Sequence, residues 1–193
     1  MLSALSAYRS GKRHHLYQGT LAWINGFGVP DFFAKGQGFY SDCFAGAEKR
    51  CADLGYKLEP FWLAQPGMTA RRASHILDSR KIAGIIVGPM PPGQDELNLQ
   101  WDKFCSVRIG YSLHALKLTT VITDHFSNLR ELFEKMLAFR FTRIGFACPR
   151  ALDDRVNNRW SGAYLAMQRR YPTQKLLEPF IDLEIHCAKE GFL

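Results

Sequence analysis

The stretch at residues 148–162, CPRALDDRVNNRWSG, holds two arginines, two aspartates and two asparagines within seven positions. Arg155 and Arg159 lie four residues apart, so on a helix they share one face. A guanidinium is a rigid fork of N–H donors that can hold two acceptor oxygens at once, such as adjacent sugar hydroxyls or a carboxylate. Three interpretations stay open from these residues alone: a solvated helix start, a nucleic-acid contact, or one side of a small-molecule site. Asp153 and Asp154 fit the first, because acidic side chains stabilise a helix start.

Catalytic motifs are incomplete in this sequence. The segment GFGVPD follows an apolar run like a dinucleotide-binding turn, but it lacks the third glycine and is interrupted by Pro30. The segment GYSLH, residues 110–114, resembles a serine nucleophile motif without its second glycine. No C-x-x-C and no pair of histidines at zincin spacing occurs. We therefore expect no enzyme, no cofactor and no metal site.

Aromatic side chains make up 13% of the chain, and several follow predicted strands. They serve either as packing or as flat faces on which sugar or base rings stack. Asn25 stands at the end of an apolar run and becomes a candidate ligand contact by that position. The aromatic residues near strand ends are Phe32, Phe33, Phe39, Tyr40, Trp62, Tyr111 and Trp160.

The elements expected around these residues alternate between strand and helix. A helix from about residue 41 to residue 54 ends at Gly55, and a second over residues 68–80 has Thr69 as its N-cap. Leu129, Leu132, Phe133 and Met136 give the helix over residues 127–140 an apolar stripe. Strands are predicted at residues 20–25, 56–63, 83–88, 105–109, 118–123 and 143–148, with a further helix at 157–171 and a possible strand at 181–186.

This alternation predicts an α/β fold with a parallel sheet and right-handed crossovers. Pro60 places the strand at 56–63 towards an edge of the sheet or at a bulge. Ligands of such sheets gather at the carboxyl ends of the strands. That rule selects the loops at residues 26–40, 63–69, 89–96 and 149–156 as candidates for a site.

The totals limit the class of protein. No apolar run in the 193 residues is long enough to cross a bilayer, and the start MLSALSAYRSGKRHH lacks the apolar core of a signal peptide, so we expect a cytoplasmic protein. The net charge of +7 permits an anionic partner. The five scattered cysteines indicate reduced core thiols.

The order of several segments resembles the effector-binding domain of LacI/GalR-type transcriptional regulators. GTLAWIN is similar to the opening strand of that family. ILDSRKIAGIIVGP resembles its leucine-rich helix followed by V-D-G-I-I. ITDHFSNLRELFEKMLAFRFTRIGFA resembles its V-D-N and L-G-H-R-R-I-A passage, and DDRVNNRWSGAYLAM resembles its R-x-x-G-F helix start. Together these segments cover roughly residues 19–168.

The resemblance implies a periplasmic-binding-protein-like type I fold, with one near-complete lobe and part of a second. It implies a sensor, not an enzyme, which binds a small effector, a sugar or similar molecule, in the cleft between the lobes. Arg159 matches the arginine with which family members grip the effector, and Asp124 matches the aspartate of V-D-N. Phe39 and Tyr40 match the aromatic pair before the first helix, and Ser127 falls where one member places an effector-contacting aspartate.

The resemblance also sets expectations for organisation and partners. Residues 1–17 look like the hinge that follows a helix-turn-helix DNA reader, residues 18–141 like the first lobe, and residues 142–193 like an incomplete second lobe. The parent protein would bind operator DNA through that reader as a homodimer. Unpaired sheet edges and exposed apolar surface lead us to expect dimerisation, pairing with another chain, or poor solubility. A free-standing sugar-binding protein of a transport system is the alternative.

Overall fold

The computed structural model describes residues 16–35, 38–171 and 176–181. Contacts divide the chain into two compact units, which are described separately below. The first unit runs up to Ile109 and includes Leu113–Thr120, whereas the second comprises Gly110–Ser112 and the residues from Val121 onward. The helix after Val121 packs with the second unit by this division, and the lobe boundary expected between residues 141 and 142 stays a prediction.

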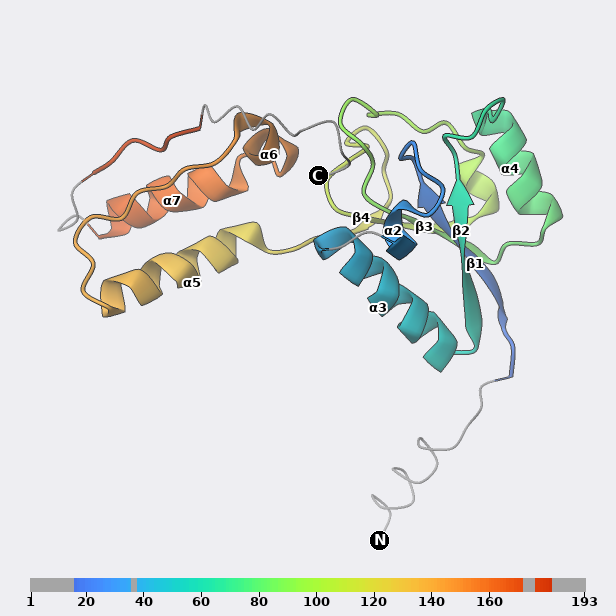
Figure 1. Ribbon diagram of the computed structural model, residues 1–193, viewed down its shortest axis with the longest axis horizontal. Coiled ribbons are helices and arrows are strands. Elements are labelled where there is room, and N and C mark those ends of the chain that lie inside the picture. The colour runs from blue at the N-terminus through green and yellow to red at the C-terminus, as the bar shows by residue number, and fades with distance from the viewer. Residues whose placement is uncertain (1–15, 36–37, 172–175, 182–193) are drawn as a thin grey trace, which may run out of the picture. The chain divides into compact units, whose positions relative to one another are not determined.

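A five-stranded sheet in the order β2-β1-β3-β4-β5 forms the centre of the first unit (Figure 1). β1 (Gly19–Asn25) pairs in parallel with β2 (Tyr56–Trp62) on one side and with β3 (Gly84–Val87) on the other. β4 (Cys105–Ile109) pairs in parallel with β3, and β5 (Thr119–Val121) follows it. The predicted parallel α/β sheet is confirmed.

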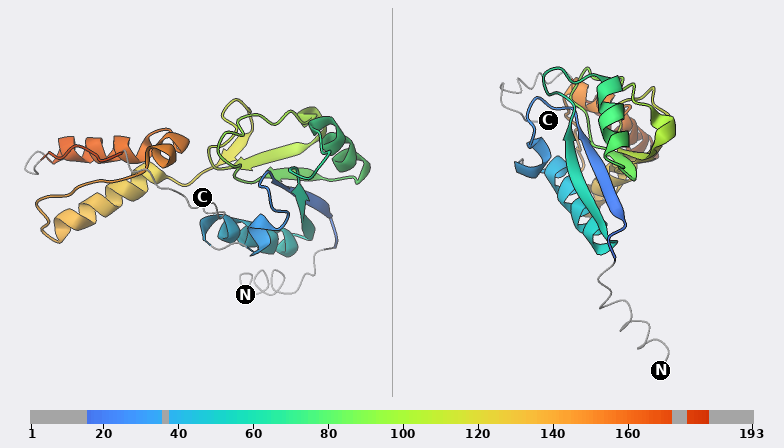
Figure 2. Two further views of the ribbon diagram at one scale, coloured as in Figure 1. Left: turned by 45° about the horizontal axis from the view of Figure 1, so that its top comes forward. Right: turned by 90° about the vertical axis from the view of Figure 1, so that its right-hand side faces the viewer.

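Helices cover both faces of this sheet (Figure 2). Trp23 of β1 packs against Phe44 of α3 (Phe39–Asp53) and Phe33 of α2 (Phe32–Lys35). Its neighbours Ala22 and Ile24 point to the opposite face, where Ala73 and Leu77 of α4 (Ala70–Ser79) are buried. Because side chains of a strand alternate between faces, the fully apolar run of β1 supplies both cores at once.

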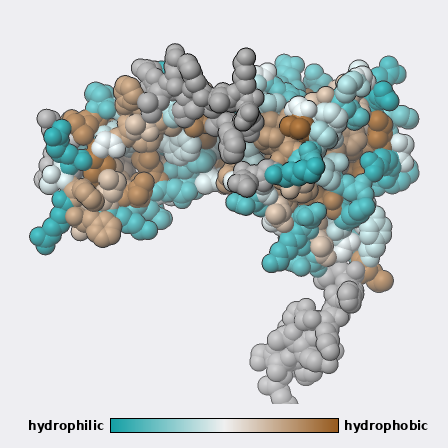
Figure 3. Space-filling view, viewed as in Figure 1, coloured by the Kyte–Doolittle hydropathy of each residue, from teal (hydrophilic) through white to brown (hydrophobic). Residues whose placement is uncertain are grey.

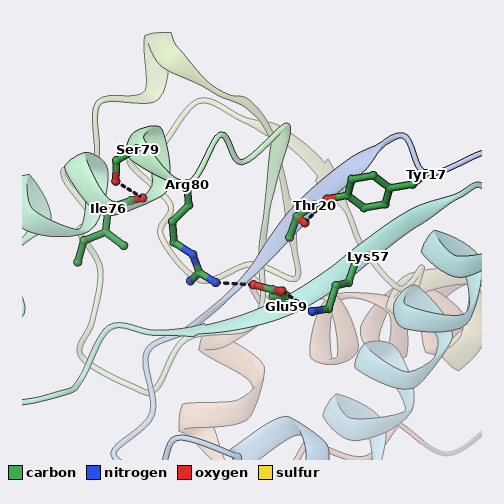
Figure 4. Close-up of polar contacts among 7 residues, drawn as sticks. All are labelled: Tyr17, Thr20, Lys57, Glu59, Ile76, Ser79 and Arg80. Atoms are coloured by element: carbon green, nitrogen blue, oxygen red, sulfur yellow. Dashed lines mark hydrogen bonds and ion pairs between the residues drawn. The ribbon is translucent and has the colours of Figure 1, made fainter.

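The edge of the sheet is formed by β2, as Pro60 predicted. Its outward Glu59 carboxylate accepts bonds from Lys57 at 2.7 Å and from Arg80, at the end of α4, at 2.6 Å (Figure 4). A strand edge that carries charges and a proline is a poor template for pairing with another chain.

Local signals place the helix ends. The Thr69 hydroxyl accepts a bond from the Arg72 backbone N–H at 3.2 Å and caps α4 as expected. Gly55 follows α3 with a φ of 82°, a left-handed conformation that glycine adopts without steric cost. A short 3-10 helix, Trp101–Lys103, precedes β4.

In its described residues the second unit contains three helices and a small core. α5 (His125–Ala138) packs against α7 (Arg159–Arg170), and α6 (Arg150–Arg155) precedes α7. The buried core residues are Phe133, Ile144, Tyr164 and Met167. Several large apolar side chains of this unit remain exposed, and apolar atoms are visible on its surface (Figure 3); they include Leu132, Phe139, Phe141 and Leu165.

Two predictions for the second unit need correction. Residues 143–148 do not form a strand: one isolated bridge joins Ala147 to Phe180, and a strand needs a continuous neighbour. Leu132, assigned to the apolar stripe of α5, is 57% exposed because the core lies beside Phe133. The short helix α6 was not predicted. Residues 1–15 of the hinge-like segment expected at 1–17, and residues 182–186 of the strand expected at 181–186, lie outside the described residues.

Candidate functional site

Arg159 lies in the second unit as the first residue of α7. Its guanidinium carbon lies 5.4 Å from the centroid of the Tyr111 ring, in the range of a cation–π contact. The side chain is exposed, and within the described part of the chain it forms no ion pair. A cation with this exposure has N–H donors available for a ligand.

Two further rings complete the group around Arg159. The His125 ring lies 5.0 Å from that of Trp160 in an edge-on arrangement and 6.1 Å from that of Tyr111. Burial lowers the pKa of His125, and the positive charge of Arg159 lowers it further. We call Tyr111, His125, Arg159 and Trp160 the Arg159 cluster. It combines flat apolar faces with one exposed cation, a combination suited to a sugar ring with polar substituents.

Asp124 and Ser127 lie beside this cluster at the start of α5. Asp124 is the N-cap residue, and its Oδ1 accepts the backbone N–H of Ser127 at 3.1 Å. These bonds from Ser127 lower the pKa of Asp124, with weaker contributions from the charges of Arg130 and Arg159. Asp124 is therefore a carboxylate that stabilises the helix start, and Ser127 takes part through its backbone.

The start of α7 depends on Asp153, which is fully buried in α6. Its Oδ1 accepts the Ser161 backbone N–H at 3.2 Å, so it caps the helix from eight residues upstream. Asn157 and Asn158, which lie between α6 and α7, have φ angles of 55° and 54°, the left-handed conformation that asparagine tolerates. The expectation that the acidic pair serves a helix start is confirmed for Asp153. Arg155 is half-buried at the end of α6.

Asn25, in the first unit, is buried at the end of β1. Its side-chain amide donates to the carbonyls of Val29 and Pro30 at 2.8 and 3.1 Å, and its oxygen accepts the Phe27 backbone N–H at 2.9 Å. Both amide hydrogens are therefore used within the adjoining loop. The bonds give Asn25 a role in shaping that loop.

Phe39 and Tyr40 begin α3, with ring centroids 5.8 Å apart. Phe39 is 57% exposed, whereas Tyr40 is half-buried and its ring lies 6.4 Å from that of Phe27. Phe27 in turn stacks on Phe32 at 3.7 Å. The first unit thus carries an aromatic group in the loop after β1, and Phe39 offers the accessible ring.

The predicted site residues fall into two groups. Arg159, Asp124 and Ser127 come together in the second unit, and Asn25, Phe39 and Tyr40 come together in the first. Sequence reasoning did not assign His125 a role, although it is the histidine of the T-D-H segment. Tyr111 and Trp160 had entered only as aromatic residues near strand ends.

Among the described residues, no three histidine, cysteine or acidic side chains are grouped so as to hold a metal ion. A search of the same residues finds no helix that is both long and apolar enough to span a membrane.

Comparisons with known proteins decide the fold. A regulatory protein of the LacI family from Chloroflexus aggregans superimposes with a TM-score of 0.60 at 18% identity, covering 86% of this chain and 58% of that one. The chain has a periplasmic-binding-protein-like fold. The resemblance to LacI-type effector-binding domains is thus confirmed at the level of fold.

Both regulators and transport proteins share this fold. The Cra transcriptional dual regulator from Pseudomonas putida, in complex with fructose 1-phosphate, matches with a TM-score of 0.52 at 18% identity over 84% of this chain and 58% of that one. The binding component of an arabinose ABC transporter from Shewanella sp. ANA-3 matches with a TM-score of 0.51 at 15% identity, over 84% and 54%. The chain spans less than two thirds of the length of these proteins. No family model and no curated protein matches the sequence.

Proposed function

We propose that the chain is the ligand-sensing part of a LacI/GalR-like transcriptional regulator and that it binds a small carbohydrate without catalysing a reaction. The observation that carries this proposal is the Arg159 cluster, where an exposed guanidinium, in no ion pair with any described residue, lies on an aromatic ring. Aromatic faces contact the apolar side of a sugar ring, and a guanidinium holds two adjacent hydroxyls or a phosphate. The solved relatives that carry fructose 1-phosphate or arabinofuranose support a ligand of this class.

In this proposal Arg159 grips the effector, with Asp124 and Arg155 beside it in the second unit. Phe39 and Tyr40 supply rings in the first unit, and Asn25 holds the loop next to them. The regulator binds operator DNA as a homodimer through a helix-turn-helix module outside this chain. Effector binding changes the relative arrangement of the lobes and thereby DNA affinity.

The binding test uses thermal shift of the full 193-residue chain with fructose 1-phosphate, L-arabinose, D-glucose and cellobiose. A sugar that binds the folded state raises the melting temperature by mass action. We expect Arg159→Ala to remove that response and Arg169→Ala, an exposed arginine on the same helix, to keep it. An unaltered response in Arg159→Ala would remove Arg159 from the site.

A second candidate function is that of a free-standing sugar-binding protein of a transport system, because a transporter component shares the fold. The coding sequence upstream of Met1 discriminates between the two. A helix-turn-helix encoded there supports the regulator, and a signal peptide supports the transport protein.

A further inference from the structure

Tyr111 belongs to a three-residue excursion of the chain. Gly110–Ser112 belongs to the second unit, while the segments on either side of it belong to the first. The excursion is fixed at its base: the Gly110 N–H donates to the Val121 carbonyl at 2.9 Å. The Arg108 guanidinium donates to the Leu113 carbonyl and, at 2.8 Å, to the Thr120 hydroxyl. These bonds restrain the backbone on both sides of Tyr111.

The face of the Tyr111 ring contacts the guanidinium of Arg159. Its hydroxyl is buried and has no hydrogen-bond partner in the described part of the chain. Its face carries the guanidinium of Arg159 at 5.4 Å, and its other ring neighbour is His125 at 6.1 Å.

Arg159 forms no ion pair with any described residue. The carboxylate whose charge acts on it, that of Asp124, caps α5 by accepting from Ser127. The charge of Arg159 also acts on His125, which places the guanidinium near that ring. The Tyr111 face is therefore the contact that restrains an otherwise exposed side chain.

We propose that Tyr111 is a positioning residue for Arg159: its ring face holds the guanidinium within the cluster before an effector arrives. The effect of Tyr111 on sugar binding rests on the proposed function, in which Arg159 is the group that grips the sugar. A side chain already in its bound position loses less conformational freedom when the ligand binds. Tyr111 thus raises affinity without any polar contact to the effector.

The deciding test needs no ligand and uses NMR titration of His125 in the full chain. Arg159→Gln removes a nearby positive charge and is expected to raise the pKa of His125. If Tyr111 holds the guanidinium there, the same substitution has a much smaller effect in a Tyr111→Leu background. Tyr111→Phe keeps the ring and is expected to leave the full effect of Arg159→Gln.

An equal effect of Arg159→Gln in the Tyr111→Leu and wild-type backgrounds overturns the positioning role. A second measurement needs no variant: the δ-methylene protons of Arg159 should be shifted upfield by the ring current of Tyr111. Their resonance at the position of an unstructured arginine would also overturn the proposal, even if Tyr111→Leu failed to fold.

The sugar arm uses whichever of the four sugars gives the largest thermal shift. Tyr111→Leu is expected to weaken its binding about two- to fivefold, the range of a cation–π contact at an exposed site, with Tyr111→Phe unchanged. Affinity that is equal in all three proteins contradicts the positioning role. If none of the sugars binds the wild-type chain, the proposed carbohydrate effector fails, while the His125 titration still decides the role of Tyr111.

Discussion

Replacing Asp153 by alanine tests how the fold builds the start of α7, where Arg159 stands. The buried carboxylate accepts the Ser161 backbone N–H, and Ser161 itself is only 7% exposed. Losing an N-cap acceptor costs about 1 kcal/mol, and leaving a buried N–H unpaired costs about 1–3 kcal/mol. Because these two costs describe the same lost bond, we expect the free energy of unfolding to fall by about 2 kcal/mol.

The assay is urea unfolding followed by tryptophan fluorescence. Asp154→Ala is the matched control, because this neighbour is exposed and is expected to change stability by less than about 0.5 kcal/mol. Asp153→Asn retains an oxygen that can accept from Ser161 and should recover much of the loss. An urea midpoint for Asp153→Ala equal to that of Asp154→Ala would refute the assignment of Asp153 as the cap of α7.

Two further predictions concern His125 and Gly88. The folded state lowers the pKa of His125 below its ordinary value of 6.5, so the unfolded chain takes up the proton at a higher pH than the folded chain does. The contribution of neutral His125 to stability is therefore present above pH 6.5 and is lost as the pH falls through the folded pKa. The melting temperature should therefore drop more between about pH 7.5 and about pH 5.5 for the wild type than for His125→Gln. Equal drops in the two proteins would contradict this prediction. A Cβ at Gly88 would lie 2.7 Å from Trp23 Nε1 and 3.1 Å from Phe33 Cζ, so Gly88→Ala should cost about 1–3 kcal/mol in urea unfolding. Gly46→Ala, where the added carbon meets nothing within 4 Å inside α3, should instead stabilise the chain, and a similar loss at both positions would argue against overpacking.

The first unit was largely predictable because its signals are local. The apolar run of β1 and the apolar residues on one face of α4 indicate directly which faces of these elements are buried. Thr69 caps with a side chain three residues from its donor, and Pro60 excludes a central strand wherever the sheet lies. Such features depend on neighbours in sequence, so the sequence alone reveals them.

The second unit was less predictable because its elements depend on distant partners. Residues 143–148 have the composition of a strand, but the described chain offers Phe180 as a single bridging partner. Asp153 serves a helix start as expected, but its partner is the Ser161 N–H, eight residues on and beyond two left-handed asparagines, which the sequence did not indicate. In both cases the deciding contact lies outside the window in which residue patterns carry information.

Asn25 and Arg159 show why position at a strand end or a helix start does not by itself identify a binding residue. Asn25 was selected by its position and Arg159 by its match to the family motif, but the amide hydrogens of Asn25 are bonded within its own loop, while the guanidinium of Arg159 is exposed. A buried amide whose donors are satisfied would have to break those bonds to reach a ligand, and it would pay for each donor left unpaired. The exposed guanidinium can donate to a ligand while it stays on the face of the Tyr111 ring. Hydrogen-bond saturation, which residue patterns do not reveal, therefore ranks Arg159 above Asn25 as a candidate for the proposed effector contact.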